Sequence, residues 1–338
     1  MESAIVPPIF CPFPQEINPH VKEVQQHVLA WVQRFGLVQK EIAQQRFRRA
    51  DFGWFAACVY PSVDIHDLEL VSDWFAWLFL VDDQLDDGVL GVQLEKARKI
   101  MGDLLAVIDD AHGSDLHLVN ASVQSSAVIA ALVDLWQRTA LHTQVAWRKR
   151  FYRHFANCFA AACWEAENRI RGIIPDVTTY IHKRRDTGAI YICLDLIDVV
   201  KKMHFPVQIY DHPVFQTLLD TSSNVICWCN DIFSLEKEVE RGEYHNLVPV
   251  LQHAQQCSLQ EAVNSANALI TTEVRHFLEA ERQMQGLFPA YTQDIQTYLA
   301  GMKSWMRGNL AWSSATERYV YVEQAQSRET VNYLDSIL

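Results

Sequence analysis

The chain is 338 residues long, with 49% hydrophobic residues, 21% charged residues and a formal net charge of −12 at pH 7. This length allows a large core, in one big helical domain or two ordinary ones. The acidic balance argues against a nucleic-acid partner and against docking on anionic lipid. The longest strongly apolar run, 74–81, is too short to span a bilayer, so no membrane contact is expected.

Residues 1–20 contain five of the eleven prolines and lack the basic start of a signal peptide. They predict a flexible, proline-rich N-terminal arm. The eight cysteines show no C-x-x-C pair and no zinc-ligand spacing. In a chain of this length they indicate reduced, mostly buried thiols and a cytoplasmic protein.

After the arm, apolar residues recur with helical spacing along nearly the whole chain. Helices are expected at about 21–35, 38–60, 64–88, 92–111, 117–141, 144–171, 176–185, 189–203, 213–241, 246–256, 259–285 and 291–311. No run of convincing length alternates with period two, so strands are not expected. The pattern predicts an all-α fold, with one domain over 21–338.

The first candidate site is an acidic cluster at the end of an apolar helix. The run 74–81 leads directly into Asp82, Asp83, Asp86 and Asp87. Each of these acids has another one helical turn away. The C-terminal end of a helix carries the negative pole of its dipole, so each acid there costs roughly 0.3–1 kcal/mol unless a cation compensates. The cluster therefore suggests a bound divalent metal.

A second set of oxygen donors lies in the expected helix at 213–241. Asn230, Ser234 and Glu238 follow one another at intervals of four residues and fan over only about 80° of the helix surface. Amide, hydroxyl and carboxylate oxygens are hard donors suited to Mg²⁺. Asparagine is a poor helix former, and here it follows an apolar stretch. This context favours a ligand set in a cavity over a solvated helix end.

The two sets, Asp-Asp-x-x-Asp and Asn-Asp-x-x-Ser-x-x-x-Glu, resemble the metal-binding motifs of class I terpene synthases of the bacterial type. In that family the first aspartate, here Asp82, is the usual direct ligand. Asp86 and Asp87 are both candidates for the third acid of the first motif. The resemblance extends over about 74–319 and is greatest to the sesquiterpene synthases.

Further motifs follow in the family's order. Arg184 lies 46 residues before Asn230, as the family's diphosphate-sensing arginine does, and Thr187 and Gly188 then match its linker and effector positions at a helix break. Arg185 beside Arg184 points about 100° away on a helix, so a salt bridge is the simpler expectation for it. The family's remaining diphosphate contacts match a lysine after the second motif and a closing Arg-Tyr pair, which here are Lys237, Arg318 and Tyr319.

The resemblance implies a single-domain helical bundle around a central active-site cavity. It implies three Mg²⁺ ions between the two motifs, bound to the diphosphate of the substrate. The rest of the cavity must be dry, because water would quench a carbocation. Candidates for its apolar wall, each of which could equally be plain core, are Phe75, Leu78, Phe79, Tyr191, Trp305 and Trp312.

The implied activity is that of a lyase: Mg²⁺-dependent ionisation of an acyclic isoprenyl diphosphate and cyclisation of the cation, by a monomer or homodimer. Farnesyl diphosphate is the expected substrate, giving a sesquiterpene, and geranylgeranyl diphosphate is the alternative. A prenyl-chain elongating transferase would be expected to carry two aspartate-rich motifs. A di-iron bundle would need two Glu-x-x-His motifs, and only Glu273-Val274-Arg275-His276 occurs. A non-catalytic scaffold would need no oxygen ligands at two helix ends.

Overall fold

The structure, a computed structural model, describes residues 4–86, 93–109, 126–141, 143–240 and 243–319. These residues form helices and connecting segments without a strand, which confirms the expected all-α class. Their contacts divide the chain into two compact units. Unit 1 comprises Met1–Ile17, Cys58–Pro61 and Arg171–Ala315, and unit 2 comprises Asn18–Ala57, Ser62–Ile170 and Thr316–Leu338. A single domain over 21–338 stays a prediction.

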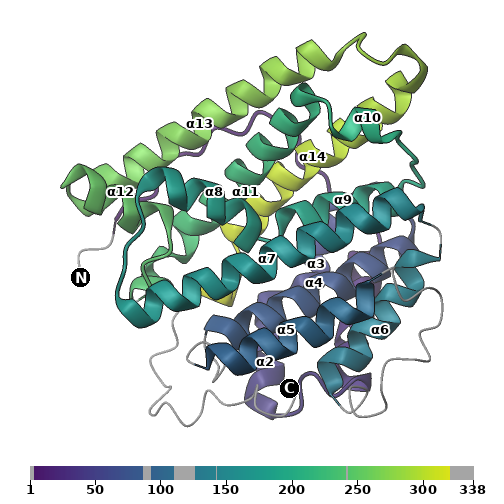
Figure 1. The fold of residues 1–338 in the computed structure, drawn as a ribbon, viewed down its shortest axis with the longest axis horizontal. Helices are drawn as coiled ribbons and strands as arrows, with labels where there is room; N and C mark the ends of the chain where they lie inside the picture. Colours follow the sequence, from purple (N-terminus) through teal and green to yellow (C-terminus); the bar gives the residue numbers. More distant parts are fainter. Residues whose placement is uncertain (1–3, 87–92, 110–125, 142, 241–242, 320–338) are drawn as a thin grey trace. The chain divides into compact units, whose positions relative to one another are not determined.

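Unit 2 is built on a fully apolar stretch of helix α4. Its helices are α1 (Val21–Arg34), α2 (Glu41–Ala50), α3 (Phe52–Val59), α4 (Ile65–Asp86), α5 (Leu94–Ile108), α6 (Ala127–Ala140) and α7 (Val145–Arg171), with the 3-10 turn η5 (Glu317–Tyr319). Helix α6 lies against both α4 and α5 (Figure 1). The Trp74 ring packs on Phe151 and Phe155 of α7, at centroid distances of 5.5 and 5.8 Å.

Two buried tryptophans of α4 also have their polar atoms satisfied. The indole nitrogen of Trp74 donates to Thr139 Oγ1 at 2.9 Å, and that of Trp77 donates to the carbonyl of Val128 at 3.0 Å. A buried N–H group without a partner would cost about 1–3 kcal/mol. These bonds fix α4 against α6 and so determine where the acidic end of α4 emerges.

The single helix expected at 38–60 is wrong, because the chain breaks at Asp51. This residue has a φ of +53°, in the left-handed region, between α2 and α3. Aspartate tolerates that conformation better than most residues. Its Oδ1 accepts a hydrogen bond from the Trp54 amide at 3.3 Å, which caps the start of α3. Apolar periodicity continues through the break and therefore hid it.

Unit 1 is arranged around the long helix α11. Its elements are α8 (Val177–Thr187), α9 (Ile190–Val200), α10 (Val207–Tyr210), α11 (Pro213–Glu240), α12 (Leu247–Gln255), α13 (Leu259–Met284), η4 (Pro289–Tyr291) and α14 (Thr292–Ser313). Helix α11 contacts α8, α9, α12, α13 and α14, and Figure 1 shows α13 and α14 running beside it. Most of α11 is therefore buried, including polar residues of its middle part such as Ser222, Ser223 and Asn224.

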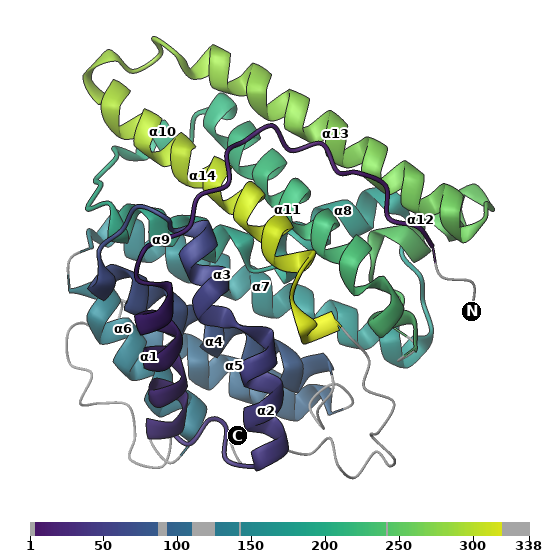
Figure 2. The ribbon, with the colours of Figure 1, turned by 180° about the vertical axis from the view of Figure 1, so that it is seen from behind.

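Residues 4–17 of the proline-rich segment run along α13 within unit 1 (Figure 2). The backbone of Ile5 exchanges two hydrogen bonds with the Gln260 side chain, at 2.8 and 2.9 Å. Further along, the Phe13 ring meets Phe277 edge-on at 5.8 Å. The mobility expected for this arm stays a prediction.

No helix in the described ranges is long and apolar enough to cross a membrane. All eight cysteines lie within those ranges, and none of them forms a disulfide. Four of them, Cys58, Cys193, Cys227 and Cys229, are buried, and the other four are half-buried, so the expectation of mostly buried thiols holds for half of the cysteines.

Candidate active site

The first acidic motif lies at the C-terminal end of α4. The Asp82 side chain is exposed, whereas Asp83, about 100° further around the helix, is buried. Asp86 is the last residue of α4, and Asp87 lies outside the described residues. Of the first two acids, Asp82 is therefore the more exposed residue.

Asp83 is paired with Arg318 from the turn η5. The two guanidinium nitrogens lie 2.9 and 3.2 Å from the two carboxylate oxygens, in a two-pronged ion pair. The guanidinium carbon also lies 4.6 Å from the centroid of the Phe79 ring. Tyr319, the other residue of the closing pair, ends η5 and is half-buried. The chain thus brings the end of α4 and the closing arginine together.

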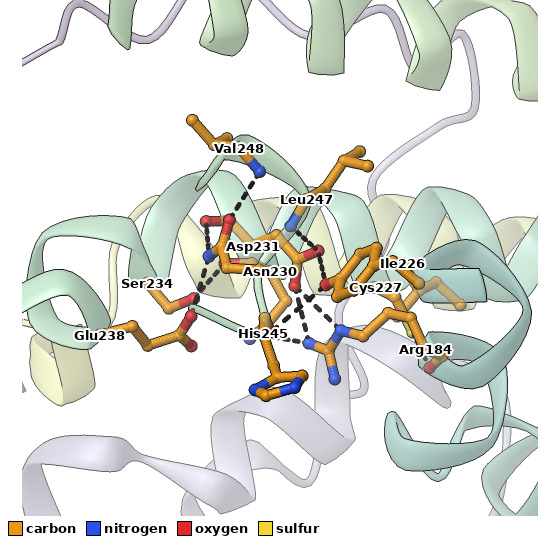
Figure 3. A network of polar contacts seen from close by, with 12 residues as sticks. Arg184, Ile226, Cys227, Asn230, Asp231, Ser234, Glu238, His245, Leu247 and Val248 are labelled. Carbon is orange, nitrogen blue, oxygen red and sulfur yellow. Dashed lines mark hydrogen bonds and ion pairs between the residues drawn. The ribbon is translucent and has the colours of Figure 1, made fainter. Parts of the chain in front are cut away.

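The second motif lies on the last turns of α11, with its three side chains on one face (Figure 3). The Ser234 hydroxyl donates to the Asn230 carbonyl at 2.7 Å, and the Asn230 amide oxygen accepts from Arg184 Nη2 at 3.0 Å. Glu238 is half-buried, as is Lys237 beside it. The 46-residue spacing between Arg184 and Asn230 is thus realised as a direct contact between α8 and α11.

Asp231 is the hub of the polar network around this motif, and it is fully buried. Its Oδ1 lies 3.0 Å from Nε and 2.9 Å from Nη2 of Arg184. Its Oδ2 accepts from the Tyr180 hydroxyl at 2.5 Å and from the Leu247 amide at 3.0 Å. Four donors around one carboxylate offset the cost of burying its charge.

Asn246, the N-cap of α12, connects this hub to Glu238. Its Nδ2 donates to the Asp231 carbonyl at 2.6 Å and to Glu238 Oε2 at 2.8 Å. Burial raises the pKa of the Glu238 carboxyl to about 7, and the nearby charge of Asp231 raises it further than the Asn246 hydrogen bond lowers it. A carboxyl with such a pKa binds protons and cations competitively near neutral pH.

The break between α8 and α9 falls at Gly188 and Ala189. The Gly188 amide donates to the Arg184 carbonyl at 3.0 Å, and Ala189 has a φ of +55°, a strained conformation for a residue with a side chain. A Cβ atom at position 188 would lie 2.4 Å from Cys227 Sγ, so only glycine fits there. The buried Oγ1 of Thr187 has no hydrogen-bond partner among the described residues.

Comparison with known proteins identifies the family. The model of "Terpene synthase family 2, C-terminal metal binding" matches residues 73–276, which is more than half of the chain and contains both donor sets. The chain belongs to this terpene synthase family. The resemblance seen in the sequence is thereby confirmed, and the match to a metal-binding region shows dependence on a divalent metal.

Characterised relatives of this terpene synthase align over nearly its whole length. It is 36% identical to "(+)-T-muurolol synthase ((2E,6E)-farnesyl diphosphate cyclizing)" of Roseiflexus castenholzii, over 93% of this chain and 94% of the relative. It is 31% identical to germacrene A synthase of Nostoc punctiforme, over 97% and 99%. Germacradien-4-ol synthase of Streptomyces citricolor has a similar structure, with a TM-score of 0.79, 27% identity and coverage of 92% and 99%.

The expected wall residues of this terpene synthase divide between the two units. In unit 2, Phe75 is buried, Leu78 is half-buried, and half-buried Phe79 stacks on Phe52 at 4.7 Å. In unit 1, Trp305 is buried with Tyr60 edge-on at 5.8 Å. The other two unit 1 residues are the buried Trp312 and the half-buried Tyr191.

The hydroxyl of Tyr191 has a specific partner that the sequence did not suggest. It donates a hydrogen bond to Asp220 Oδ1 of α11 at 2.7 Å, and the same carboxylate is the partner of Arg185 from α8. Arg185 Nη1 lies 2.5 Å from Asp220 Oδ2, which confirms the salt bridge expected for this arginine. Tyr191 therefore directs its polar atom toward a half-buried ion pair.

The residues of the second motif fit a divalent metal by their chemistry. An amide oxygen, a hydroxyl and a carboxylate on one helix face form a hard, oxygen-only donor set of the kind that Mg²⁺ prefers. Among the described residues, no group of three or more His, Cys, Asp or Glu side chains could hold a metal ion. At this motif the donors of a metal would be Asn230 and Ser234 together with Glu238.

Sequence reasoning gave no role to three residues of this network. Asp231 stands next to Asn230 in an otherwise apolar stretch, which is a signal that could have singled it out. Asn246 precedes the apolar Leu247 and Val248 and could have been read as a helix cap. Tyr180 carries no such signal, since nothing in its local pattern indicates a buried hydroxyl.

Proposed function

We propose that this terpene synthase ionises (2E,6E)-farnesyl diphosphate in the presence of Mg²⁺ and cyclises the resulting carbocation to a sesquiterpene, with release of diphosphate. The observation that carries the proposal is that each oxygen-donor motif has an arginine at hydrogen-bond distance, Arg318 at Asp83 and Arg184 at Asn230. The names of the relatives, which include two farnesyl diphosphate cyclising enzymes, support the choice of substrate.

The proposed ligands for Mg²⁺, three ions in all, are Asp82, Asp83, Asp86 or Asp87, and the set Asn230, Ser234 and Glu238. When bound, the metal neutralises the charge of the diphosphate and makes it a better leaving group. The exposed position of Asp82 at the end of α4 supports its role as the principal ligand of the first motif.

The proposed diphosphate donors are Arg184, Lys237, Arg318 and Tyr319. A guanidinium has five N–H donors, and the pair with Asp83 uses two of those on Arg318. The remaining N–H groups are available to phosphoryl oxygens that develop charge as the carbon–oxygen bond breaks. Arg184 contacts α11 through Asn230 and Asp231, and its carbonyl accepts a hydrogen bond from the Gly188 amide, so a response of Arg184 to diphosphate would pass to the helix break at Gly188.

The proposed cavity wall is Phe75, Leu78, Phe79, Tyr191, Trp305 and Trp312. Aromatic faces stabilise a nearby cation by roughly 0.5–2 kcal/mol each, and apolar walls exclude the water that would quench it. Of these residues, Phe79 already has one face against the Arg318 guanidinium. That contact supports a role for its ring beside positive charge.

The enzyme is further proposed to work in the cytoplasm as a monomer or homodimer. Its net charge of −12 supports the absence of a nucleic-acid partner and of binding to anionic membranes.

The test is incubation of the purified enzyme with geranyl, farnesyl and geranylgeranyl diphosphates and Mg²⁺, with products identified by gas chromatography and mass spectrometry. Cyclic C15 products from farnesyl diphosphate are expected. Cyclic C20 products alone would assign a diterpene cyclase instead, and longer prenyl diphosphates would assign a chain-elongating transferase.

A further inference from the structure

The C-terminal half of α11 is tied to α8 and α12 by two buried side chains that carry no role in the proposed chemistry. One is the Asp231 carboxylate, and the other is the Asn246 amide; both side chains are completely buried. Buried polar groups need full hydrogen bonding, so the hydrogen bonds to each of them restrict the orientations that neighbouring side chains can adopt.

The Asp231 carboxylate fixes the direction of the Arg184 side chain. It accepts from Arg184 Nε and lies 2.9 Å from Nη2, while Tyr180 and Leu247 hold its other oxygen. The carboxylate cannot rotate without losing these donors from α8 and α12. Arg184 Nη2 consequently stays beside the Asn230 amide oxygen, at 3.0 Å.

The Asn246 amide fixes one oxygen of Glu238. Its Oδ1 accepts from the Val248 amide at 2.9 Å, which caps α12, and its Nδ2 donates to the Asp231 carbonyl and to Glu238 Oε2. This combination needs one acceptor and two donor hydrogens, which an amide has and a carboxylate or hydroxyl lacks. Capping alone would be served equally well by Asp or Ser.

We infer that Asp231 and Asn246 are positioning residues of the second metal motif: Asn246 holds the Glu238 carboxylate, and Asp231 holds the Arg184 guanidinium, in the orientation that the metal and the diphosphate require. The inference rests on the proposed function. Partners that orient metal ligands in this way typically contribute 10–100-fold to metal affinity or activity.

Three substitutions separate positioning from helix capping. Asn246→Asp and Asn246→Ser both keep an oxygen that can cap α12, and both remove the amide donor from Glu238. Asn246→Asp additionally places a carboxylate oxygen against Glu238. Ser258→Ala is the matched control, because Ser258 caps α13 through the Glu261 amide and is remote in sequence from both motifs.

The readout is thermal unfolding of the metal-free full-length enzyme during titration with Mg²⁺ at a fixed concentration of inorganic diphosphate, followed by kcat and KM for farnesyl diphosphate. Both Asn246 variants are expected to keep the helical circular dichroism and to need at least tenfold more Mg²⁺ for half-maximal stabilisation. Asp231→Asn is expected to raise the half-saturating diphosphate concentration at fixed Mg²⁺ by a similar factor. Ser258→Ala is expected to lower the melting temperature without shifting either midpoint.

Two outcomes overturn different parts of this account. Unchanged midpoints in Asn246→Asp and Asn246→Ser, with a normal response of the wild-type enzyme, would reduce Asn246 to a helix cap and leave the proposed function standing. A wild-type enzyme that Mg²⁺ and diphosphate together fail to stabilise would overturn the proposed function and the positioning role with it.

Discussion

Replacing Gly188 by alanine adds one methyl group at the helix break beside Arg184, the proposed diphosphate sensor. The backbone accepts this change, because Gly188 has a φ of −67°. The side chain does not fit, since its Cβ would lie 2.4 Å from Cys227 Sγ and 3.1 Å from the Arg184 carbonyl. Either α8 or the cysteine must move by about 1 Å.

Overpacking of this kind costs about 1–3 kcal/mol, and the better helix propensity of alanine offsets up to about 1 kcal/mol of it. With an unfolding entropy of about 2.1 cal/mol/K per residue, the remaining loss of about 0–2 kcal/mol lowers the melting temperature by up to about 3 °C. Turnover is expected to fall by about 10²-fold, because a shift of 1 Å in α8 displaces Arg184. Differential scanning fluorimetry and steady-state kinetics measure the two effects.

The double variant Gly188→Ala/Cys227→Ala tests the cause of the loss. Removing the sulfur relieves the closest contact, so the double variant should lose at least about 1 kcal/mol less stability than the sum of the two single variants. Gly102→Ala is the control: nothing lies within 4 Å of its added Cβ, and this exposed site in α5 should become more stable. Additive losses at positions 188 and 227 would refute the contact as the reason for glycine.

Asp82→Ala should abolish turnover while leaving the circular dichroism intact, and retained activity would remove Asp82 from the metal ligands. Phe79→Ala should change the ratio of products in mass spectrometry. An unaltered product profile would show that this ring packs in the core and does not line the cavity. Arg318→Gln should lower the free energy of unfolding by about 3–5 kcal/mol in denaturant titrations, because it leaves the Asp83 carboxylate buried without its cation; a change below 1 kcal/mol would contradict this. Mg²⁺ affinity in calorimetry should rise with pH up to about pH 7 and then level off, because Glu238 must lose a proton to bind metal, and Glu238→Gln should abolish this dependence. The raised pKa of Glu238 also implies that the metal-free protein loses stability as pH rises from about 4.5 to about 7, where the unfolded chain has released the proton that the folded state retains.

The helices and the two oxygen-donor motifs could be predicted from the sequence because both depend on local spacing. Apolar periodicity locates α4 and α11, and the positions at which it gives way to polar residues mark the helix ends that carry the two motifs. The break at Asp51 escaped this reasoning, since one residue in the left-handed region leaves the periodicity on both sides intact. A short helix break depends on the backbone angles of one residue, and the apolar periodicity of the sequence does not report those angles.

The contacts that organise the second motif could not be predicted, because they join side chains from different helices. Asp231 receives donors from α8 and α12, and Asn246 reaches back to Glu238 across the end of α11. Spacing along one helix says nothing about which side chain of a neighbour fills the space beside it. The same holds for Cys227, whose sulfur explains the glycine at position 188.

The most direct test of the account measures inorganic diphosphate and cyclic C15 product in the same reaction with farnesyl diphosphate. With Mg²⁺, about one diphosphate should be released for each cyclic product formed, and both should disappear after chelation and return when Mg²⁺ is added back. Release of diphosphate without any cyclic product, or turnover that survives chelation, would contradict the proposal that this chain is a metal-dependent sesquiterpene cyclase.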